Sequence, residues 1–406
     1  MSNALALSAT DECIAREDAW GAHNYHPLDL VVAHAEGAWV TDVEGQRYLD
    51  CLSAYSAVNQ GHCHPRILAT LVQQASRVTL TSRAFRNEQL GLFCEELAAL
   101  CDMEMVLPMN TGAEAVETAI KAARRWGYTK KGIAQDQATI IAFDNNFHGR
   151  TTTIVGFSSE PAYKANFGPF APGFVLVPFG DIEAVRAAMT ANTCAVLLEP
   201  MQCEAGVLMP PDGFLSALAE LCRTERVLLI ADEIQTGLGR TGRMFACDHE
   251  GVRPDMYVLG KALSGGFYPV SAVVSRRDVL DVFGPGSHGS TFGGNPLGCA
   301  VARTALHVLQ DEGLVERSST LGAWFLAQLQ TISHPRIVAV RGRGLMVAIE
   351  LNERARPWCE ALKERGMLCK ETHDFVIRLS PPLVVSEDDL AWAVEQLREL
   401  FAARAG

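Results

Sequence analysis

The chain has 406 residues, of which 48% are hydrophobic and 20% are charged, and its formal net charge is −12. These values are ordinary for a soluble globular protein of two or three domains at roughly 150 residues each, and the acidic balance argues against nucleic acid and membrane partners. No apolar run is long enough to span a bilayer. The N-terminus lacks the basic start of a secretory signal, and the 12 cysteines include no CxxC pair, so we expect reduced thiols in a cytoplasmic protein.

The first predicted element is a hairpin, because residues 36–50 alternate apolar and polar side chains around a turn at Glu44 and Gly45. Short runs rich in Ile, Leu and Val then alternate with amphipathic patterns. This alternation indicates buried parallel strands joined by helices. The candidate strands span residues 138–143, 174–179, 195–199, 227–232, 257–259 and 270–274, and the candidate helices span residues 113–128, 182–189 and 214–224.

The C-terminal part shows a different order of elements. A long amphipathic helix at residues 296–309 is followed by a further helix, a strand at 345–351, a helix at 357–365, a strand at 376–379 and a helix at 387–401. We therefore predict an α/β protein in three parts. Residues 1–54 form an N-terminal segment, residues 55–301 a large domain with a mostly parallel central sheet, and residues 302–406 a smaller α+β domain.

Three short motifs suggest ligands that their surroundings do not support. Residues 237–242 match GxGxxG, but no clear helix pattern follows, as a dinucleotide site requires. Gly260-Lys261 lacks the other residues of a phosphate loop. His62 and His64 flank a cysteine before a proline, where a turn is the simpler interpretation, and no second pair has zinc spacing. We predict no metal site.

A carboxylate and an amine at the ends of neighbouring strands form a stronger signal. Asp232 ends one apolar strand, and Lys261 follows the next. Carboxyl ends of strands in α/β sheets are where such folds bind ligands. A lysine there, followed by a Gly-rich turn, would be partly desolvated, which lowers its pKa and makes it nucleophilic. Either residue alone could be a solvated lysine or a helix cap.

A phosphate site is predicted where residues 110–114 (NTGAE) open a helix. The free N–H groups and the helix dipole suit a phosphate, although Thr111 could be a plain N-cap. A phosphate site, a lysine amine and a carboxylate together describe a site for pyridoxal phosphate. In such a site Lys261 forms the Schiff base and Asp232 keeps the pyridine nitrogen protonated.

These residues carry a resemblance to a known family, the class III aminotransferases of fold type I, which use pyridoxal phosphate. The segments DEIQTG (232–237) and GKALSGG (260–266) are typical of the class, and SAYSAVNQGHCHP (53–65) is similar to its ornithine-acting members. The matching stretches lie at residues 21–28, 53–65, 80–85, 106–119, 131–135, 147–151, 167–174, 230–243, 259–273, 288–299, 339–345 and 377–383.

The resemblance implies roles for the cofactor residues. It makes Lys261 the Schiff-base lysine and proton carrier, Asp232 the partner of the pyridinium nitrogen, and Gln235 the partner of the ring oxygen. Phe147 and Ile234 would enclose the ring. The phosphate would be bound by Thr111, Gly112 and Ala113, and by Ser290 and Thr291 of a partner subunit, which makes the protein a homodimer or a dimer-based oligomer.

The resemblance also implies a substrate pocket. Tyr25 and Arg150 would hold the α-amino and α-carboxylate end of ornithine, and Tyr55 would shape the pocket. Glu204 and Arg378 would form an ion pair that opens for the second substrate. Two positions depart from the pattern: His148 stands where many ornithine enzymes have Trp, and Cys203 stands where the family usually has Gly, so its Cβ could shift Glu204.

The expected activity is transfer of the δ-amino group of L-ornithine to 2-oxoglutarate by a ping-pong mechanism. The alternatives within the class are acetylornithine and 4-aminobutyrate as donors. The tyrosine pair argues against them, and His148 argues for the first. A racemase or decarboxylase on the same fold is an alternative outside transamination, and a non-enzymatic binding protein conflicts with the presence of Lys261, Asp232 and Gln235.

Overall fold

A computed structural model describes residues 7–404 of the chain. Its largest element is a seven-stranded sheet in the order β4-β10-β9-β8-β7-β5-β6. All neighbours from β9 to β6 are parallel, whereas β10 is antiparallel to both β9 and β4. The mostly parallel sheet is therefore confirmed. Its strands are β4 (Met105–Met109), β5 (Thr139–Phe143), β6 (Phe174–Val177), β7 (Thr193–Leu198), β8 (Leu228–Asp232), β9 (Met256–Leu259) and β10 (Ser271–Ser275).

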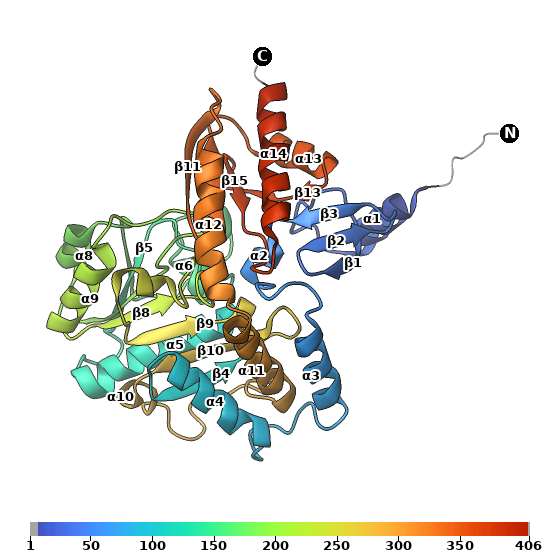
Figure 1. The fold of residues 1–406 in the computed structure, drawn as a ribbon. Coiled ribbons are helices and arrows are strands. Elements are labelled where there is room, and N and C mark those ends of the chain that lie inside the picture. Colours follow the sequence, from blue (N-terminus) through green and yellow to red (C-terminus); the bar gives the residue numbers. More distant parts are fainter. Residues whose placement is uncertain (1–6, 405–406) are drawn as a thin grey trace.

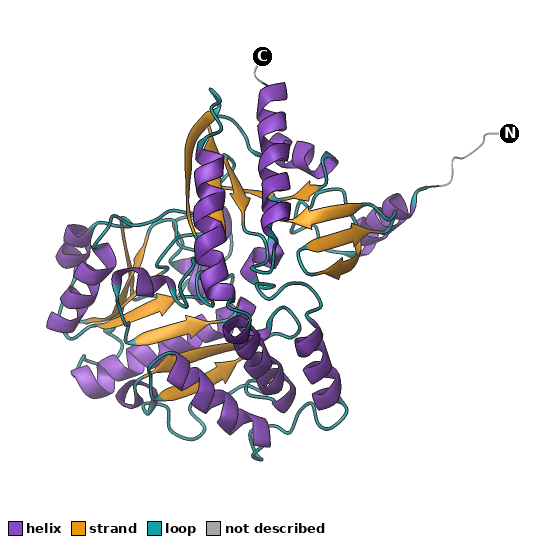
Figure 2. Ribbon diagram, in the orientation of Figure 1, coloured by secondary structure: helices purple, strands orange, loops and turns teal. Residues whose placement is uncertain are grey.

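Helices cover both faces of this sheet (Figure 2). Alternate residues of β5 belong to different cores, since Ile141 and Phe143 pack in one cluster and Ile140 and Ala142 in the other. Burial on both faces explains why the strands are continuous apolar runs. The helices of this part are α3 (Pro65–Ala75), α4 (Glu88–Leu100), α5 (Gly112–Trp126), α6 (Thr152–Gly156), α7 (Pro161–Lys164), α8 (Ile182–Ala188), α9 (Phe214–Thr224), α10 (Arg277–Leu280) and α11 (Pro296–Asp311).

Two smaller sheets lie above the large one in Figure 1. One is an antiparallel sheet in the order β11-β12-β15-β14, and the other has the order β1-β2-β3-β13. The N-terminal and C-terminal parts contain these two sheets. Their helices and strands are α1 (Ala9–Trp20), β1 (Val32–Glu36), β2 (Trp39–Asp42), β3 (Arg47–Asp50), α2 (Ser53–Ser56), α12 (Leu314–Gln330), β11 (Ile337–Arg343), β12 (Met346–Leu351), α13 (Arg356–Glu364), β13 (Met367–Leu368), β14 (Lys370–Thr372), β15 (Val376–Leu379) and α14 (Glu387–Ala403).

The N-terminal segment and the C-terminal part share one sheet. The predicted hairpin is present as β2 and β3, and β13 adds to β3 in parallel. The predicted boundary near residue 301 falls inside the continuous helix α11, whereas the one near residue 54 falls inside α2, a four-residue turn whose residues have positive φ angles.

The GxGxxG segment is a turn that holds these parts together. Its Arg240 is fully buried and donates to the carbonyl oxygens of Leu345 at 2.7 Å and Pro381 at 2.6 Å. The same guanidinium donates to the Ser53 hydroxyl at 3.0 Å and to the Asn59 side chain. Burial lowers the pKa of Arg240 to about 9. These contacts give the segment a structural role.

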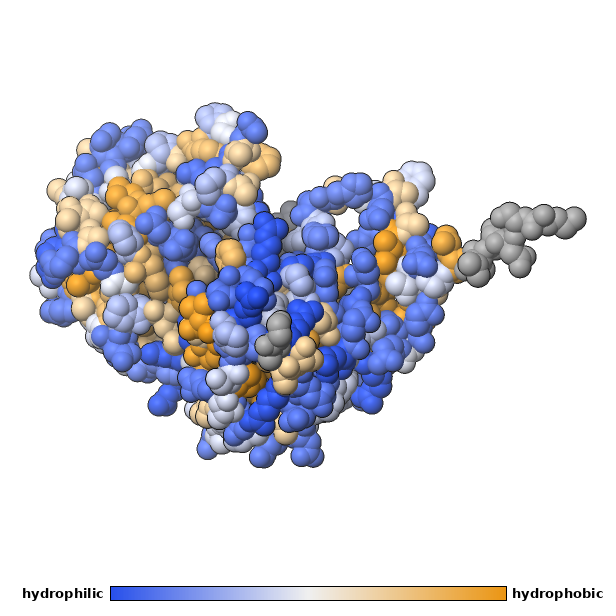
Figure 3. Space-filling view, turned by 90° about the horizontal axis from the view of Figure 1, so that it is seen from above, coloured by the Kyte–Doolittle hydropathy of each residue, from blue (hydrophilic) through white to orange (hydrophobic). Residues whose placement is uncertain are grey.

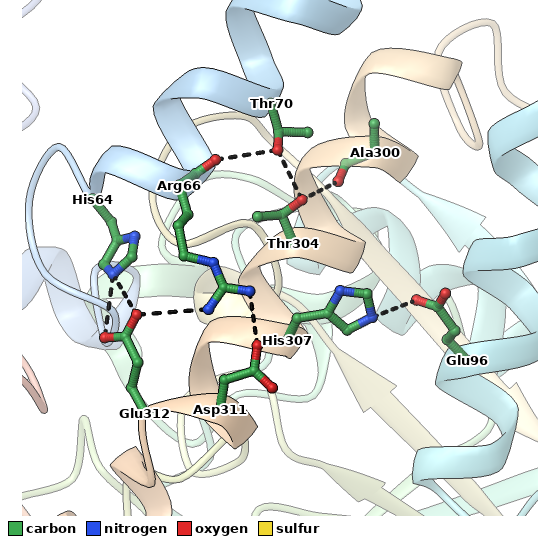
Figure 4. A network of polar contacts seen from close by, with 9 residues as sticks. All are labelled: His64, Arg66, Thr70, Glu96, Ala300, Thr304, His307, Asp311 and Glu312. Carbon is green, nitrogen blue, oxygen red and sulfur yellow. Dashed lines mark hydrogen bonds and ion pairs between the residues drawn. The ribbon is translucent and has the colours of Figure 1, made fainter.

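A surface polar network joins the helices beneath the small sheets. His64, just before α3, lies 3.1 Å from Glu312, and Arg66 lies 2.7 Å from Asp311 at the end of α11 (Figure 4). The other histidine of the pair, His62, lies 2.7 Å from Asp50. Each histidine of the HCH motif therefore pairs with a different carboxylate.

The face seen in Figure 3 is mostly hydrophilic, with apolar residues in separate small areas. None of the helices within residues 7–404 has both the length and the apolar character that crossing a membrane requires.

Candidate active site

The predicted site residues converge on the carboxyl edge of the central sheet. Five loops that follow β4, β5, β7, β8 and β9 meet there, and each supplies predicted residues. This edge is where open α/β sheets bind ligands, because the loops that follow adjacent parallel strands lie side by side. β15 and the segments around Tyr25 and Tyr55 complete the site from the N-terminal and C-terminal parts.

Lys261 lies where three cavities meet. It lines a ring-sized cavity of about 140 Å³, a second of about 300 Å³ toward the start of α5, and a cleft of about 770 Å³ toward the small sheets. Its φ is 45°, in the left-handed region that non-glycine residues rarely adopt. Burial lowers the pKa of the Lys261 amine, although the nearby Glu204 charge acts in the opposite direction. The amine is therefore easier to deprotonate than that of a solvated lysine.

Asp232 ends β8 as a buried carboxylate that lines the ring-sized cavity. One of its oxygens lies 2.7 Å from His148 Nδ1, and the other accepts the backbone N–H of Ile234 at 3.1 Å. His148 is itself buried, and its Nε2 has no hydrogen-bond partner within the described residues. The position that departs from the ornithine pattern thus supports the carboxylate predicted to face the cofactor.

Phe147 and Ile234 both line this cavity together with Gly112. A Cβ at Gly112 would lie 3.0 Å from Ile234 Cδ1, so a larger residue there would press on the side chain that bounds the cavity. The arrangement leaves space for a flat group beside Asp232 and Lys261.

The start of α5 leaves two N–H groups free. The carboxylate of Glu114 accepts the N–H groups of Asn110 and Thr111, both at 2.9 Å, while those of Gly112 and Ala113 have no acceptor within residues 7–404. The Thr111 hydroxyl accepts the Glu114 N–H at 3.3 Å and thus caps the helix. Two free amides at the N-terminus of a 15-residue helix suit a phosphate group.

Ser290 and Thr291 lie in the loop before α11. Within this chain the Ser290 hydroxyl accepts from Asn110 Nδ2 at 2.8 Å and from the Gly293 N–H at 3.0 Å, and Thr291 is exposed. Their contribution to a partner's site stays a prediction.

The larger cleft contains all five predicted substrate residues. They are Tyr25, Tyr55, Arg150, Glu204 and Arg378, and Lys261 lines the same cleft. The Arg378 guanidinium lies 5.2 Å from the centre of the Tyr55 ring.

Glu204 and Arg378 form an ion pair of 2.6 Å. The Arg378 side chain is 1% exposed and that of Glu204 is 23% exposed. Burial by itself would raise the pKa of the Glu204 carboxyl, but Arg378 and Lys261 hold that pKa below its usual value. The same carboxylate accepts from Gln235 Nε2 at 3.2 Å, so Gln235 links the ion pair to the ring-sized cavity.

Cys203 is accommodated without a left-handed backbone angle. It is fully buried in a small core with Met201, Val207 and Met346. Its carbonyl accepts from Arg378 Nη1 at 3.3 Å. The Cβ that the family pattern lacks therefore packs into this core and leaves the Glu204–Arg378 pair intact.

Sequence reasoning missed Tyr163, which holds the predicted carboxylate-binding arginine. The Arg150 guanidinium lies 3.7 Å from the centre of the Tyr163 ring, and this ring also packs edge-on against Phe147. Tyr163 lies on the short helix α7, and no sequence motif marks it.

Glu199 was also missed, although it follows β7 in the same way that Asp232 ends β8. It is 6% exposed, lines the ring-sized cavity and accepts the N–H of Phe147 at 3.2 Å. Burial, followed by the charge of Asp232, raises the pKa of Glu199 well above its ordinary value. Its place at the end of a strand was the available signal.

The comparisons with known proteins agree with this geometry. The profile described as aminotransferase class-III matches residues 20–401. The chain is 59% identical over 396 residues to the ornithine aminotransferase of Bacillus subtilis, covering 98% of this chain and 99% of that relative. It is 58% identical over 395 residues to the ornithine aminotransferase of Brevibacillus brevis, covering 97% and 99%.

Solved structures show the same likeness. The ornithine aminotransferase of Toxoplasma gondii superimposes with a TM-score of 0.96 at 45% identity over 98% of this chain and 96% of that one. An acetylornithine aminotransferase from Elizabethkingia anophelis gives 0.89 at 47% identity over 98% and 100%. A second Toxoplasma structure is described with partial occupancy of pyridoxal phosphate at its active site. Matched over nearly its whole length, the chain belongs to the class-III aminotransferases, a family of pyridoxal-phosphate-dependent enzymes.

Proposed function

We propose that the protein transfers the δ-amino group of L-ornithine to 2-oxoglutarate, giving glutamate 5-semialdehyde and glutamate. The observation that carries this proposal is the cleft with two arginines, of which Arg378 is paired with Glu204 and Arg150 is not paired with a carboxylate within the described residues. Ornithine and 2-oxoglutarate are unlike substrates, and a site that serves both needs one arginine that is paired and one that is free. The ornithine aminotransferases among the relatives support the choice of donor.

The cavity residues fit pyridoxal phosphate. Lys261 would bind it covalently, Asp232 would face its ring nitrogen, and the free N–H groups of Gly112 and Ala113 would hold its phosphate. When bound, this cofactor supplies a carbonyl group that takes up the amine and a ring that accepts electrons from the substrate carbon. The buried carboxylate of Asp232, held by His148, favours a protonated ring nitrogen.

The donor presents two amines, so the cleft must orient it. Arg150 can bind the α-carboxylate through a planar two-point contact, and Tyr25 lies in the same cleft. Holding the α end there would leave the δ-amine toward Lys261, whose Nζ would accept the proton from the substrate carbon. Arg378 does not compete for the α-carboxylate of ornithine while Glu204 neutralises the Arg378 charge.

The acceptor binds in the opposite sense. 2-Oxoglutarate would place its α-carboxylate on Arg378 and its distal carboxylate on Arg150, which requires the Glu204–Arg378 pair to open. The two half-reactions share one site and run in turn, as in a ping-pong mechanism.

We further propose that the enzyme is a homodimer with shared active sites. Val72, Phe85, Leu92 and Phe292 are exposed large apolar side chains on α3, on α4 and in the loops before α4 and α11. A second copy covering such residues would remove them from water and bring its Ser290 and Thr291 toward the phosphate site. The cysteines within the described residues are all free, which suits a reducing, cytoplasmic compartment.

A donor panel tests the proposed activity. The purified protein, supplied with pyridoxal phosphate and 2-oxoglutarate, is given ornithine, N-acetylornithine or 4-aminobutyrate, and glutamate and the cyclised semialdehyde are measured. We expect the highest kcat/KM with ornithine, and neither product with the variant Lys261→Ala, which should also lose the visible absorbance of the bound cofactor. A preference for N-acetylornithine would favour the alternative suggested by His148 and by the Elizabethkingia relative. Conversion of ornithine to its enantiomer, or release of CO2 from it, without a keto acid would instead indicate a racemase or a decarboxylase.

A further inference from the structure

The segment that carries Tyr25 has no secondary structure of its own. Residues 22–30 lie between α1 and β1 outside any helix or strand, and residues 22–27 are exposed. Tyr25 is 73% exposed and yet lines the substrate cleft. Because no regular element fixes this residue, its position must come from contacts with other parts of the chain.

Arg356, at the start of α13, holds this segment by its backbone. Its Nη1 donates to the carbonyl oxygen of His26 at 3.1 Å, and its Nη2 donates to that of Pro27 at 2.6 Å. A planar guanidinium can bind two successive carbonyls at once, whereas an ammonium group is a single point of charge. The Arg356 side chain is only 18% exposed, so these bonds are partly shielded from water.

Two lysines complete the attachment. Lys370 Nζ donates to the carbonyl oxygen of His26 at 3.5 Å, and Lys363 Nζ donates to that of Asp29 at 3.1 Å. Within residues 7–404, every hydrogen bond that links residues 24–30 to the chain outside residues 22–30 comes from Arg356, Lys363 or Lys370.

The other side of Arg356 faces a second segment of the cleft. Its Nη1 lies 3.3 Å from the carboxylate of Glu371, which lines the cleft, and its Nε lies 2.8 Å from Glu360 on the outer surface of α13. The neighbour of Glu371, Thr372, donates from its hydroxyl to the backbone carbonyl of Glu204. Arg356 therefore joins the Tyr25 segment to the strand that also supports the ion pair, without lining the cleft itself.

We propose that Arg356 is a positioning residue that holds Tyr25 against the cleft and thereby sets recognition of the donor end farthest from Lys261. The inference rests on the proposed function, because it assigns to Tyr25 the α end of ornithine. Arg356 acts only through the segment it holds, so its effect depends on whether the donor carries an α-amino group.

The test compares two donors of equal length. Ornithine and 5-aminopentanoate share the carboxylate and the reacting amine, and only ornithine has the α-amino group. In the holoenzyme with saturating 2-oxoglutarate, Arg356→Met should lower kcat/KM for ornithine about tenfold, mainly through KM, as expected for one lost polar contact. The value for 5-aminopentanoate should change by less than about twofold. The control Glu399→Gln removes the 2.9 Å ion pair with Arg365 just after α13, which involves neither Arg356 nor the Tyr25 segment, and should leave both donors unchanged.

A double variant tests whether the effect passes through Tyr25. In the Tyr25→Ala background, Arg356→Met should no longer change the ratio of the two donors. Arg356→Lys, which can bind one carbonyl, should restore part of the ornithine preference. If Arg356→Met does not fold, Lys363→Met should give a smaller loss in the same direction.

Equal losses for both donors, or a further loss of the ratio in the Tyr25→Ala background, would overturn the inference. So would an unchanged ratio in both Arg356→Met and Lys363→Met. Failure of the wild-type protein to act on ornithine would instead overturn the proposed function, so the two failures are distinguishable.

Discussion

The carboxylate of Glu204 lies 2.6 Å from the buried guanidinium of Arg378, and the centre of the Tyr55 ring lies 5.2 Å from the same guanidinium. An unpaired guanidinium in this position would attract the α-carboxylate of ornithine and place the wrong amine at Lys261. In the proposed function the pair would have two tasks, because it would stay closed while ornithine is bound and open when 2-oxoglutarate binds. Such a switch works only if the two pairings of Arg378 are close in free energy.

Removal of Glu204 should unmask Arg378 permanently. In Glu204→Ala the half-reaction with glutamate should become faster, while the ornithine half-reaction should slow or lose its δ-selectivity. The ratio of the two rates should shift at least about tenfold, because a charged hydrogen bond contributes about 1.5–3 kcal/mol. Stopped-flow measurement of each half-reaction gives the ratio, and Glu160→Gln, another acid of the cleft, is the control. Equal slowing of both half-reactions would indicate that Glu204 and Arg378 form a permanent structural salt bridge.

Replacement of Asp232 should affect chemistry more than folding. Asp232→Ala removes the charge that favours a protonated ring nitrogen, and we expect the half-reaction rate to fall about 100-fold or more, the scale of a lost electrostatic contact in an active site. The adjacent Glu233 is also buried, but it binds the N–H of Cys247 and faces away from the ring-sized cavity. Glu233→Gln is therefore the matched control. A loss below about threefold in Asp232→Ala would contradict the role.

Tyr55 should set the choice of donor rather than the rate of the chemical step. Tyr55→Ile should lower activity with ornithine and raise the activity with 4-aminobutyrate relative to that with ornithine. The reason is that the aromatic ring beside the Arg378 guanidinium is replaced by a smaller aliphatic side chain. The φ of Tyr55 is 60°, where a β-branched residue is strained, so the ratio of donors is the relevant quantity and thermal unfolding is measured alongside. Tyr55→Phe keeps the ring and should keep the ratio. An equal fall in activity with both donors would show that Tyr55 contributes only packing.

Glu199 should make folding stability depend on pH. Its raised pKa means that the folded state holds its proton at pH values where the unfolded chain has lost it. Stability therefore falls as pH rises above the unfolded pKa of about 4.3, by at most about 1.4 kcal/mol per pH unit, until the folded pKa is reached. Glu199→Gln removes this loss, so its stability relative to wild type should increase with pH in that window.

Urea unfolding of the cofactor-free protein at a series of pH values measures this difference, with the exposed Glu220→Gln on α9 as the control. A difference between Glu199→Gln and wild type that stays constant across the series would show that the carboxyl is not protonated in the folded state.

The hydrophobic periodicity of the sequence was sufficient to predict an element where one burial pattern runs through the whole element. The helix expected at residues 214–224 and the strand expected at 376–379 have the observed bounds, because amphipathic and buried patterns respectively are continuous there. β4 and β11 were missed. β4 contains a proline and is only half-buried over its first residues, and β11 is mostly half-buried, so neither is a clear apolar run. The strand expected at 270–274 is antiparallel, a direction that a run buried on both faces does not reveal.

The sequence by itself determined the chemistry of this protein. A carboxylate and a lysine at the ends of apolar strands, with a capped helix nearby, indicate the cofactor, and the motifs around them indicate the family that the comparisons show. Only the tertiary structure decided how distant residues assist: His148 on Asp232, Tyr163 under Arg150, and Arg356 on the Tyr25 segment. The physical reason is that local patterns record which faces of an element are buried, whereas these contacts join different elements, and the one made by Arg356 spans 330 positions and depends on how the N-terminal and C-terminal parts pack.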